Sequence, residues 1–497
     1  AFQCRPNNPG LAVSVVKDGK ILFAKGYGVS DNISKKPVTN NTLFQIASLT
    51  KAFTSTLLTK QLDQYSNLSV TSNVADIIGN GFKFSTSIRT VNANIRDLMA
   101  HTLAIPSNNG MRLDNKLTRD NLPSRLRTLK SIHAFRTSFI YSNLNYGLLT
   151  HISEKLGHDK WENLMQQEIF NPLGMSTTSF VTRDNSGRDV ATGYDDGPSG
   201  LLVPVSVEFS RQYASAVSGS GCIMSSAVDM TKWMNFHLNG GKNEHGVQVV
   251  NKSSVESTHI ARNHIVSSTV EKYFSQPKVP VSTSENNYAA GWKTGHYRGY
   301  RILRHTGSTY GYVSLITLFP DMNIGIFMSM TGSDQHYLFR ALIHNFLSDV
   351  VLGVHPWLNE STICSFPKPW YDSIHISNYY VISKSHKASR PLTEYVGSYT
   401  NDAYGTLDVT YNTSSSQLEL KYGIGQWTLY PRLTHDQFSG EAQGLLQTVY
   451  DLHTIKFLSS KTSRVSAINA VEVTSFETSS PPVFTRSSNF GPPNVVG

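Results

Sequence analysis

The feature that most constrains the fold is the position of the strand patterns, which lie at both ends of a long, mostly helical stretch. Residues 11–16 alternate as in a strand, Asp18-Gly19 follows as a tight turn, and residues 21–24 continue the pattern, as is typical of a β-hairpin. Residues 313–330 predict two more strands joined by a turn. We therefore expect an α+β fold in which one sheet unites the two ends of this stretch.

Helical patterns fill the middle of the stretch. Apolar side chains recur at helical spacing in residues 48–65, 95–101, 142–157, 159–170 and 229–238. Hydrophobic residues make up 39% of the 497 residues, and a chain of this length and composition buries a substantial core. The composition excludes a fully disordered chain, a collagen and a coiled-coil rod.

The pattern changes after residue 352, which we take as the end of the first domain, residues 1–352. Residues 353–390 are rich in proline and polar residues without a sustained period, which indicates a linker or a wrapping segment. Residues 391–475 contain short alternating runs separated by turns, and they predict a small all-β barrel or sandwich. Residues 476–497 carry Ser-Pro and Gly-Pro runs and are expected to be a disordered tail.

The charge pattern excludes some classes of partner. Lys and Arg number 44 against 35 Asp and Glu, which gives a formal net charge of +9. No block of like charges indicates a nucleic-acid-binding arm, and no apolar run reaches the roughly 18 residues that a membrane span needs. The positive balance favours anionic substrates, or contacts with an acidic polysaccharide or mineral matrix; ordinary surface charge is the alternative.

The three cysteines, Cys4, Cys222 and Cys364, form neither a disulfide framework nor a zinc-binding spacing. Cys4 and Cys364 would be able to pair in a secreted protein, and Cys222 lies among small residues as in a buried position. The first residue, Ala1, is consistent with a cleaved signal peptide or with a trimmed chain. Six sequons would be usable for glycosylation in the secretory pathway: Asn32, Asn40, Asn67, Asn251, Asn359 and Asn412.

The strongest chemical motif is Ser48-Leu-Thr-Lys51 at the start of a predicted helix. A spacing of three residues puts both side chains on one helix face. A serine hydroxyl becomes a good nucleophile when a base takes its proton, and a neutral lysine amine is such a base if its surroundings lower its pKa. The helix start also directs backbone N–H groups toward a developing oxyanion. The alternative for the bare tetrapeptide is an ordinary helix start with a surface lysine.

Two further motifs supply groups of the same kind. Tyr141-Ser-Asn143 precedes a predicted helix, where the phenol would relay a proton and the amide would hold Lys51; a buried tyrosine with a capping asparagine is the alternative. His305-Thr-Gly307-Ser308 precedes the predicted strand that begins near residue 313. A strand that ends in glycine lets a substrate approach its backbone closely.

The three motifs, in this order and with these separations, resemble the active-site motifs of the serine β-lactamase and penicillin-binding-protein superfamily, class C-like branch. The resemblance extends over residues 9–350, and residues 392–474 are similar to the lipocalin-like barrel often appended to such enzymes. It implies a β-lactamase/transpeptidase-like fold, an antiparallel sheet flanked by helices plus a helical lobe.

The resemblance also implies roles for residues. Ser48 would be the acylated nucleophile, Lys51 its general base, and Tyr141 the proton shuttle to the leaving group, while Asn143 would position Lys51 and the substrate. His305 and Gly307 occupy the places of a Lys-Thr-Gly motif, and the N–H groups of Ser48 and Ser308 would form the oxyanion hole. No metal or organic cofactor is needed.

The sequence departs from the family pattern where His305 replaces the usual lysine and where residues 103–106 replace the usual Ser-Gly-Leu. Histidine is largely neutral near pH 7, so we expect a small ester or amide substrate without a carboxylate anchor at this position. His101 we interpret as a structural histidine.

We therefore predict a secreted, extracellular serine hydrolase that works through a Ser48 acyl-enzyme. Because the family has animal extracellular members, including one similar protein of mollusc shell matrix, a matrix protein with secondary or lost catalysis is the alternative. A third hypothesis is an intracellular or mitochondrial member that regulates lipid metabolism through peptidase activity.

Overall fold

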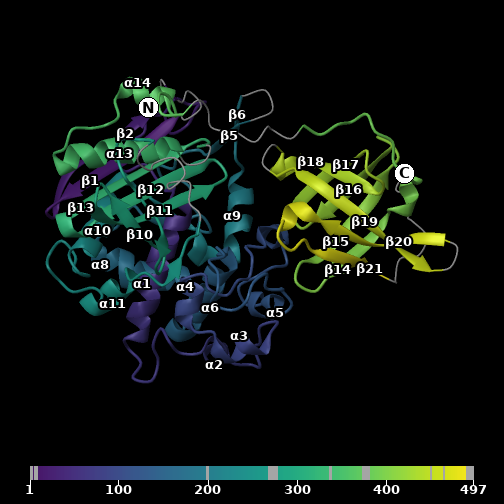
Figure 1. The fold of residues 1–497 in the computed structure, drawn as a ribbon, viewed down its shortest axis with the longest axis horizontal. Coiled ribbons are helices and arrows are strands. Elements are labelled where there is room, and N and C mark those ends of the chain that lie inside the picture. The colour runs from purple at the N-terminus through teal and green to yellow at the C-terminus, as the bar shows by residue number, and fades with distance from the viewer. Residues whose placement is uncertain are drawn as a thin grey trace.

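The computed structural model describes residue 4 and residues 9–196, 201–266, 278–334, 338–371, 381–447, 450–462 and 465–487. These residues form two bodies, a larger mixed domain and a smaller all-β domain, which lie side by side in Figure 1. In the described part of the chain, no helix has both the length and the apolar character to cross a bilayer.

The first domain is organised around an antiparallel sheet with the strand order β2-β1-β13-β12-β11-β10-β9-β8. Its strands are β1 (Gly10–Lys17), β2 (Lys20–Gly28), β8 (Asn263–His264), β9 (Asn287–Tyr288), β10 (Lys293–Tyr297), β11 (Tyr300–Thr309), β12 (Tyr312–Phe319) and β13 (Ile324–Thr331). Because β1 pairs with β13 from Leu11↔Met330 to Lys17↔Ile324, the sheet joins distant parts of the chain. The predicted α+β class is confirmed.

Both faces of the sheet are covered by helices. Helix α13 (Leu338–Leu352) packs on one face against Leu315 and Met328. Helix α10 (Ala227–Leu238) packs on the other face, against Ile316 and Phe327. Neighbouring residues of a strand point to opposite faces, so β12 and β13 are buried on both sides. This explains why their sequences are almost continuously apolar.

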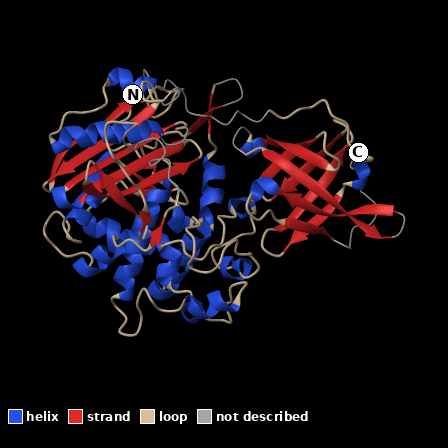
Figure 2. Ribbon diagram, viewed as in Figure 1, coloured by secondary structure: helices blue, strands red, loops and turns tan. Residues whose placement is uncertain are grey.

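The helical lobe lies below the sheet in Figure 2. Its segments and the remaining short elements are α1 (Thr50–Leu62), α2 (Val74–Ile78), α3 (Ser87–Asn92), α4 (Ile95–Met99), α5 (Leu122–Leu126), α6 (Asn143–Gly157), α7 (Trp161–Met165), the π-helix Gln166–Phe170, α8 (Asn171–Leu173), α9 (Val207–Ser215), α11 (Lys252–Thr258), β3 (Phe44–Gln45), β4 (Ser179–Phe180), β5 (Tyr194–Asp196), β6 (Leu202–Pro204) and β7 (Ile223–Ser225). Helix α1 is buried along nearly its whole length, so it forms the centre of the domain.

The second domain is a closed antiparallel barrel. Its strands are β14 (Gly397–Asn401), β15 (Gly405–Asn412), β16 (Gln417–Tyr422), β17 (Gly425–Pro431), β18 (Gln437–Gln443), β19 (Leu452–Thr462), β20 (Val465–Val473) and β21 (Val483–Arg486). Closure removes the unpaired strand edges that an open sheet of this size would expose.

The prediction of a disordered tail over residues 476–497 is wrong for its first part. Strand β21 closes the barrel by pairing with both β14 and β20, and the Phe484 side chain is fully buried. The barrel therefore runs beyond the predicted end at residue 475, because Pro481 and Pro482 lead into a strand and do not end the fold. Residues 488–497 lie outside the described residues.

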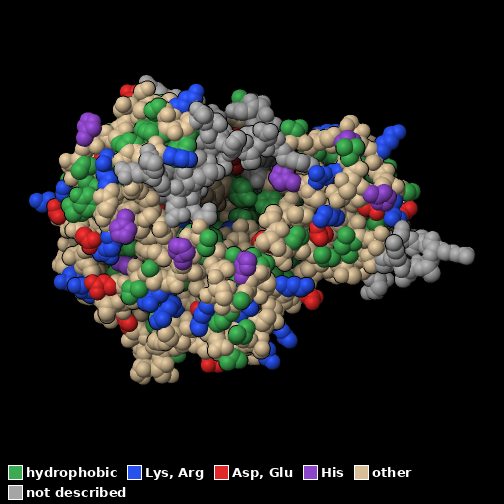
Figure 3. Space-filling view, viewed as in Figure 1, with side chains coloured by type: hydrophobic (Ala, Val, Ile, Leu, Met, Phe, Trp, Pro, Cys, Tyr) green, Lys and Arg blue, Asp and Glu red, His purple; other side chains and the backbone are tan. Residues whose placement is uncertain are grey.

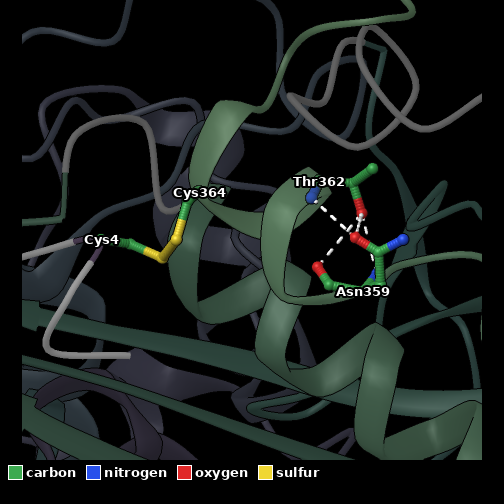
Figure 4. Close-up of a disulfide and its surroundings, with 4 residues drawn as sticks. All are labelled: Cys4, Asn359, Thr362 and Cys364. Atoms are coloured by element: carbon green, nitrogen blue, oxygen red, sulfur yellow. Dashed lines mark hydrogen bonds between the residues drawn. A yellow bond between two sulfur atoms is a disulfide. The ribbon is translucent and has the colours of Figure 1, made fainter.

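The segment that follows α13 is fastened to the first domain. It contains α14 (Glu360–Ser365), and Cys364 forms a disulfide with Cys4 (Figure 4). Cys222 is a buried free thiol, as its surroundings predicted. Of the six sequon asparagines, Asn32 and Asn412 are partly exposed and the other four are exposed; glycosylation stays a prediction.

Candidate active site

Ser48 lies on a short turn at the entrance of α1. The turn spans Ala47–Leu49, and Ala47 takes a left-handed backbone conformation with φ +47°, which few residues other than glycine adopt. Ser314 Oγ donates a hydrogen bond to Ile46 O at 2.9 Å, so strand β12 holds the approach to this turn. A strained backbone position that its surroundings hold fixed is common at functional sites.

The Lys51 amine is buried between three oxygen atoms. Its Nζ lies 3.1 Å from Ser48 Oγ, 2.8 Å from Asn143 Oδ1 and 2.8 Å from Ser220 O. Burial and then the charge of Arg112 lower the pKa of Lys51 well below its ordinary value. The oxygens of Asn143 and Ser220 only accept, so a neutral amine donates to these two and leaves its lone pair for the Ser48 proton.

Tyr141 supplies the second contact to the nucleophile. Its hydroxyl donates to Ser48 Oγ at 2.9 Å, and burial raises its pKa, so the group stays a protonated phenol. The His101 ring packs against Tyr141 with centroids 4.5 Å apart, and His101 Nδ1 accepts from Ser142 N at 3.2 Å. His101 therefore supports the tyrosine segment from behind, in agreement with a structural role.

Asn143 connects this group to the barrel. Its Nδ2 donates to Asn109 Oδ1 at 3.0 Å, and Asn109 begins the turn Asn109–Leu113. The preceding residue, Asn108, donates its N–H to Glu477 Oε2 at 3.0 Å and accepts from the Tyr404 hydroxyl at 2.7 Å. Two barrel residues therefore hold the turn on which the Asn143 amide depends.

The barrel holds the same turn at two more points. Ile424 N donates to Leu113 O at 3.0 Å. A Cβ on Gly110 would come within 2.5 Å of the Phe476 side chain, so only glycine fits between the turn and the barrel. These contacts fix the position of the turn relative to Asn143.

His305 lies on β11 but makes no hydrogen bond to Ser48 or Lys51. Its Nδ1 donates to Thr306 O at 2.7 Å, and its Nε2 accepts from the Tyr288 hydroxyl at 2.9 Å. Burial lowers the pKa of His305 well below its ordinary value. The group in the place of the family's lysine is thus a neutral ring.

Gly307 lets β11 pass directly beside the nucleophile turn. A Cβ at this position would lie 2.2 Å from Ile46 O and 2.1 Å from Ser314 Oγ, so a larger residue would push the strand away. Ser308 is exposed, and its Oγ accepts from Arg340 Nη2 at 2.8 Å. The predicted oxyanion role of the Ser48 and Ser308 N–H groups stays a prediction.

Direct hydrogen bonds thus connect Ser48, Lys51, Tyr141 and Asn143, and β11 brings His305, Gly307 and Ser308 beside them. This arrangement suits transfer of an acyl group to a serine, because the nucleophile contacts both a base and a phenol acid. Among the described residues, no group of three or more His, Cys, Asp or Glu side chains is placed to hold a metal ion.

A sequence model described as Beta-lactamase matches residues 1–344. The chain belongs to the beta-lactamase family. This membership confirms the resemblance that the three motifs indicated.

Two relatives and one solved structure illustrate the range of the family. Gigasin-6 of Magallana gigas is 38% identical over 239 residues, which cover 47% of this chain and 78% of that protein. Unguisins hydrolase ungD of Aspergillus violaceofuscus is 27% identical over 452 residues, 87% of this chain and 79% of that protein. The octameric penicillin-binding protein homologue from Pyrococcus abyssi has a TM-score of 0.59 at 20% identity and covers 96% of both chains, so the likeness in fold includes the barrel.

Four residues near the site were not found from the sequence of this beta-lactamase family member: Asn109, Arg112, Ser220 and Tyr288. Asn109 and Arg112 lie on an irregular loop, Ser220 acts through its backbone oxygen, and Tyr288 lies on a strand of two residues. None of these positions has a local pattern that distinguishes it from a surface loop.

Proposed function

We propose that this beta-lactamase family member is a serine hydrolase that acts on a small ester or amide through a Ser48 acyl-enzyme. The observation that carries the proposal is the pair of contacts at Ser48 Oγ, with Lys51 Nζ at 3.1 Å and the Tyr141 hydroxyl at 2.9 Å. The lowered pKa of Lys51, which burial causes, favours the neutral amine that acts as the base. The name of the fungal relative, a hydrolase, supports the same class of reaction.

In the proposed reaction, Ser48 Oγ attacks the carbonyl carbon while its proton passes to Lys51 Nζ. The negative oxygen is stabilised by the N–H groups of Ser48 and Ser308. Tyr141 gives its phenol proton to the leaving atom, and the proton held by Lys51 restores the phenol. Water then attacks the carbonyl carbon of the Ser48 ester and gives its proton to Lys51 Nζ. The bond between this carbon and Ser48 Oγ breaks, the acid is released, and Oγ takes the proton back from Lys51.

The neutral His305 ring sets the expected preference among substrates. A lysine at this position would offer a fixed positive charge to a carboxylate, whereas the ring is already engaged with Tyr288. We therefore propose that simple esters are better substrates than β-lactams, whose carboxylate needs that charge.

The test compares hydrolysis of 4-nitrophenyl acetate and of a chromogenic cephalosporin by the wild type and by Ser48→Ala. We expect ester turnover in the wild type and none above the blank in the variant, with unchanged circular dichroism. Equal turnover by the two proteins would overturn the assignment of Ser48. Rapid cephalosporin turnover would overturn the preference that we assign to His305.

We further propose that the chain is secreted. The Cys4–Cys364 disulfide supports this, since such bonds persist in oxidising compartments. Exposed sequons at Asn40, Asn67, Asn251 and Asn359 support it too. Protein taken from tissue without reductant should resist thiol alkylation at both cysteines and lose mass on deglycosylation. Alkylated cysteines and an unmodified mass would instead support an intracellular location.

The matrix role is the rival proposal, and the formal net charge of +9 favours it. It predicts that Ser48→Ala retains full binding to an acidic polysaccharide at physiological salt. Immunostaining that places the protein in a deposited matrix, together with no Ser48-dependent turnover, would favour this role over hydrolysis.

A further inference from the structure

Arg112 lies next to the catalytic group without belonging to it. Its Nη1 is 3.5 Å from Asn109 Oδ1, the atom that accepts from Asn143. Its Nε donates to Tyr213 O at 2.8 Å, and the guanidinium lies 3.6 Å from the centre of the Tyr213 ring. These contacts fix the side chain before any substrate arrives, as a preorganised binding group requires.

The charge of Arg112 has no carboxylate partner in the described part of the chain, and the oxygens that accept from it are neutral. Two nearby cations whose charge acts on His305 are paired instead, Lys293 with Glu285 at 2.7 Å and Arg340 with Asp334 at 3.1 Å. A partly buried cation without a counterion is costly unless an anion binds beside it. Of these three cations, Arg112 is therefore the one whose charge no carboxylate of the described residues neutralises.

The surroundings of Arg112 are aromatic and come from both domains. The Tyr310 ring lies 5.4 Å from that of Tyr213 and 6.4 Å from that of Tyr450 in the barrel. Burial raises the pKa of Tyr310 and of Tyr450, so neither ring supplies a negative charge. Helix α9, which carries Tyr213, lies between the sheet of the first domain and the barrel in Figure 1, and the space-filling view of the same face shows a hollow between the two domains (Figure 3).

A chain of contacts leads from Ser48 to Arg112 through Lys51, Asn143 and Asn109. Tyr141, the proposed proton donor to the leaving group, packs against His101, Tyr288 and His305. Arg112 lies beyond Asn143, at the far end of the hydrogen bonds that lead away from Ser48. In the proposed reaction the leaving group faces Tyr141, and we assign the side of Asn143 and Arg112 to the acyl chain.

We infer that Arg112, with the rings of Tyr213, Tyr310 and Tyr450 around it, binds a carboxylate carried by the acyl group of the substrate. The inference rests on the proposed hydrolysis through Ser48 and names its substrate class: esters or amides of acyl groups that end in an acid. A guanidinium binds a carboxylate through two parallel hydrogen bonds. The neutral His305 thus faces an uncharged leaving group, and the cationic Arg112 binds an anionic acyl group.

The test uses two esters of matched length, 4-nitrophenyl hydrogen adipate and 4-nitrophenyl hexanoate. The ratio of their kcat/KM values is measured for the wild type, Arg112→Gln, Arg112→Lys and Arg211→Gln. Arg211 is an exposed residue of α9, so its variant makes the same change in net charge outside the site. Ser48→Ala supplies the blank for spontaneous hydrolysis, including attack by the adipate's own carboxylate.

We expect the wild type to prefer the adipate and Arg112→Gln to lose about 10-fold or more in the ratio. The loss should appear mainly as a higher KM for the adipate, Arg112→Lys should keep part of the preference, and Arg211→Gln should keep all of it. An unchanged ratio in Arg112→Gln, or an equal loss in Arg211→Gln, would overturn the inference while the hydrolase assignment stands. Failure of the wild type to cleave either ester above the Ser48→Ala blank would instead overturn the proposed function.

Discussion

The two domains differ in the buried titratable groups that they hold at their centres. In the barrel, the buried hydroxyls of Tyr399 and Tyr422 donate to backbone oxygens of the same domain, Tyr395 O and Tyr404 O, each at 2.8 Å. In the first domain, Lys51 and His305 are buried and bonded to other side chains. Backbone partners are fixed by the strands, whereas side-chain partners depend on several elements meeting correctly.

This difference shows which domain is built for rigidity and which holds reactive groups. A buried amine whose pKa is lowered is less stable than an apolar side chain of the same size. The first domain keeps Lys51 despite this cost. The barrel adds a stiff support, and through Tyr404 and Glu477 it holds the turn that positions Asn143.

The largest effect is expected from Lys51→Met. The variant fills the same space without a base, so ester hydrolysis should fall about 10²- to 10⁴-fold, while the melting temperature should stay equal or rise because no amine is buried. Hydrolysis of 4-nitrophenyl acetate measures the loss of rate, and calorimetry measures the melting temperature. A variant that keeps the full rate would show that another group removes the Ser48 proton.

A smaller effect is expected from the barrel contacts. Tyr404→Phe and Glu477→Gln each weaken the hold on Asn108 and should lower kcat about 10-fold, because a displaced turn misplaces Asn143. Tyr399→Phe removes a hydroxyl that serves only the barrel and is the matched control. If all three variants lose the same activity, the barrel contributes stability and not position.

The smallest effect concerns pH and stability. The pKa of Lys51 is lowered in the folded state from 10.5, so the unfolded chain binds more protons between the lowered value and 10.5. The wild type should therefore gain stability over Lys51→Met as pH rises through this window and lose it as pH falls. Urea unfolding at several pH values measures the difference, and a gap that widens with rising pH in favour of Lys51→Met would contradict the burial of a neutral amine.

The sequence was informative where chemistry depends on local spacing. Ser48 and Lys51 lie three residues apart on one helix turn, and Tyr141 and Asn143 lie at one helix start, so their proximity within each motif follows from helical geometry. The sequence carried no sign of Asn109 or Arg112, because their roles depend on where an irregular loop meets other elements.

The barrel was predicted as a class but not at its end. The alternation in residues 397–422 indicated strands, whereas the serines and prolines before Val483 resembled a disordered tail. Their true role became visible only from the burial of Phe484 and the pairing of β21 with β14. Closure of a barrel is a long-range property that no short segment records.

The contact between Asn108 and Glu477 joins residues 369 positions apart, and this separation has a consequence for the order of synthesis. The ribosome releases the nucleophile and its base early, but the groups that hold their supporting turn come near the end of the chain. Strand β1 likewise waits for β13 before it can pair, and such distant contacts form slowly. A nascent chain that has not yet reached Glu477 thus carries the reactive residues without all of the contacts that hold their supporting turn.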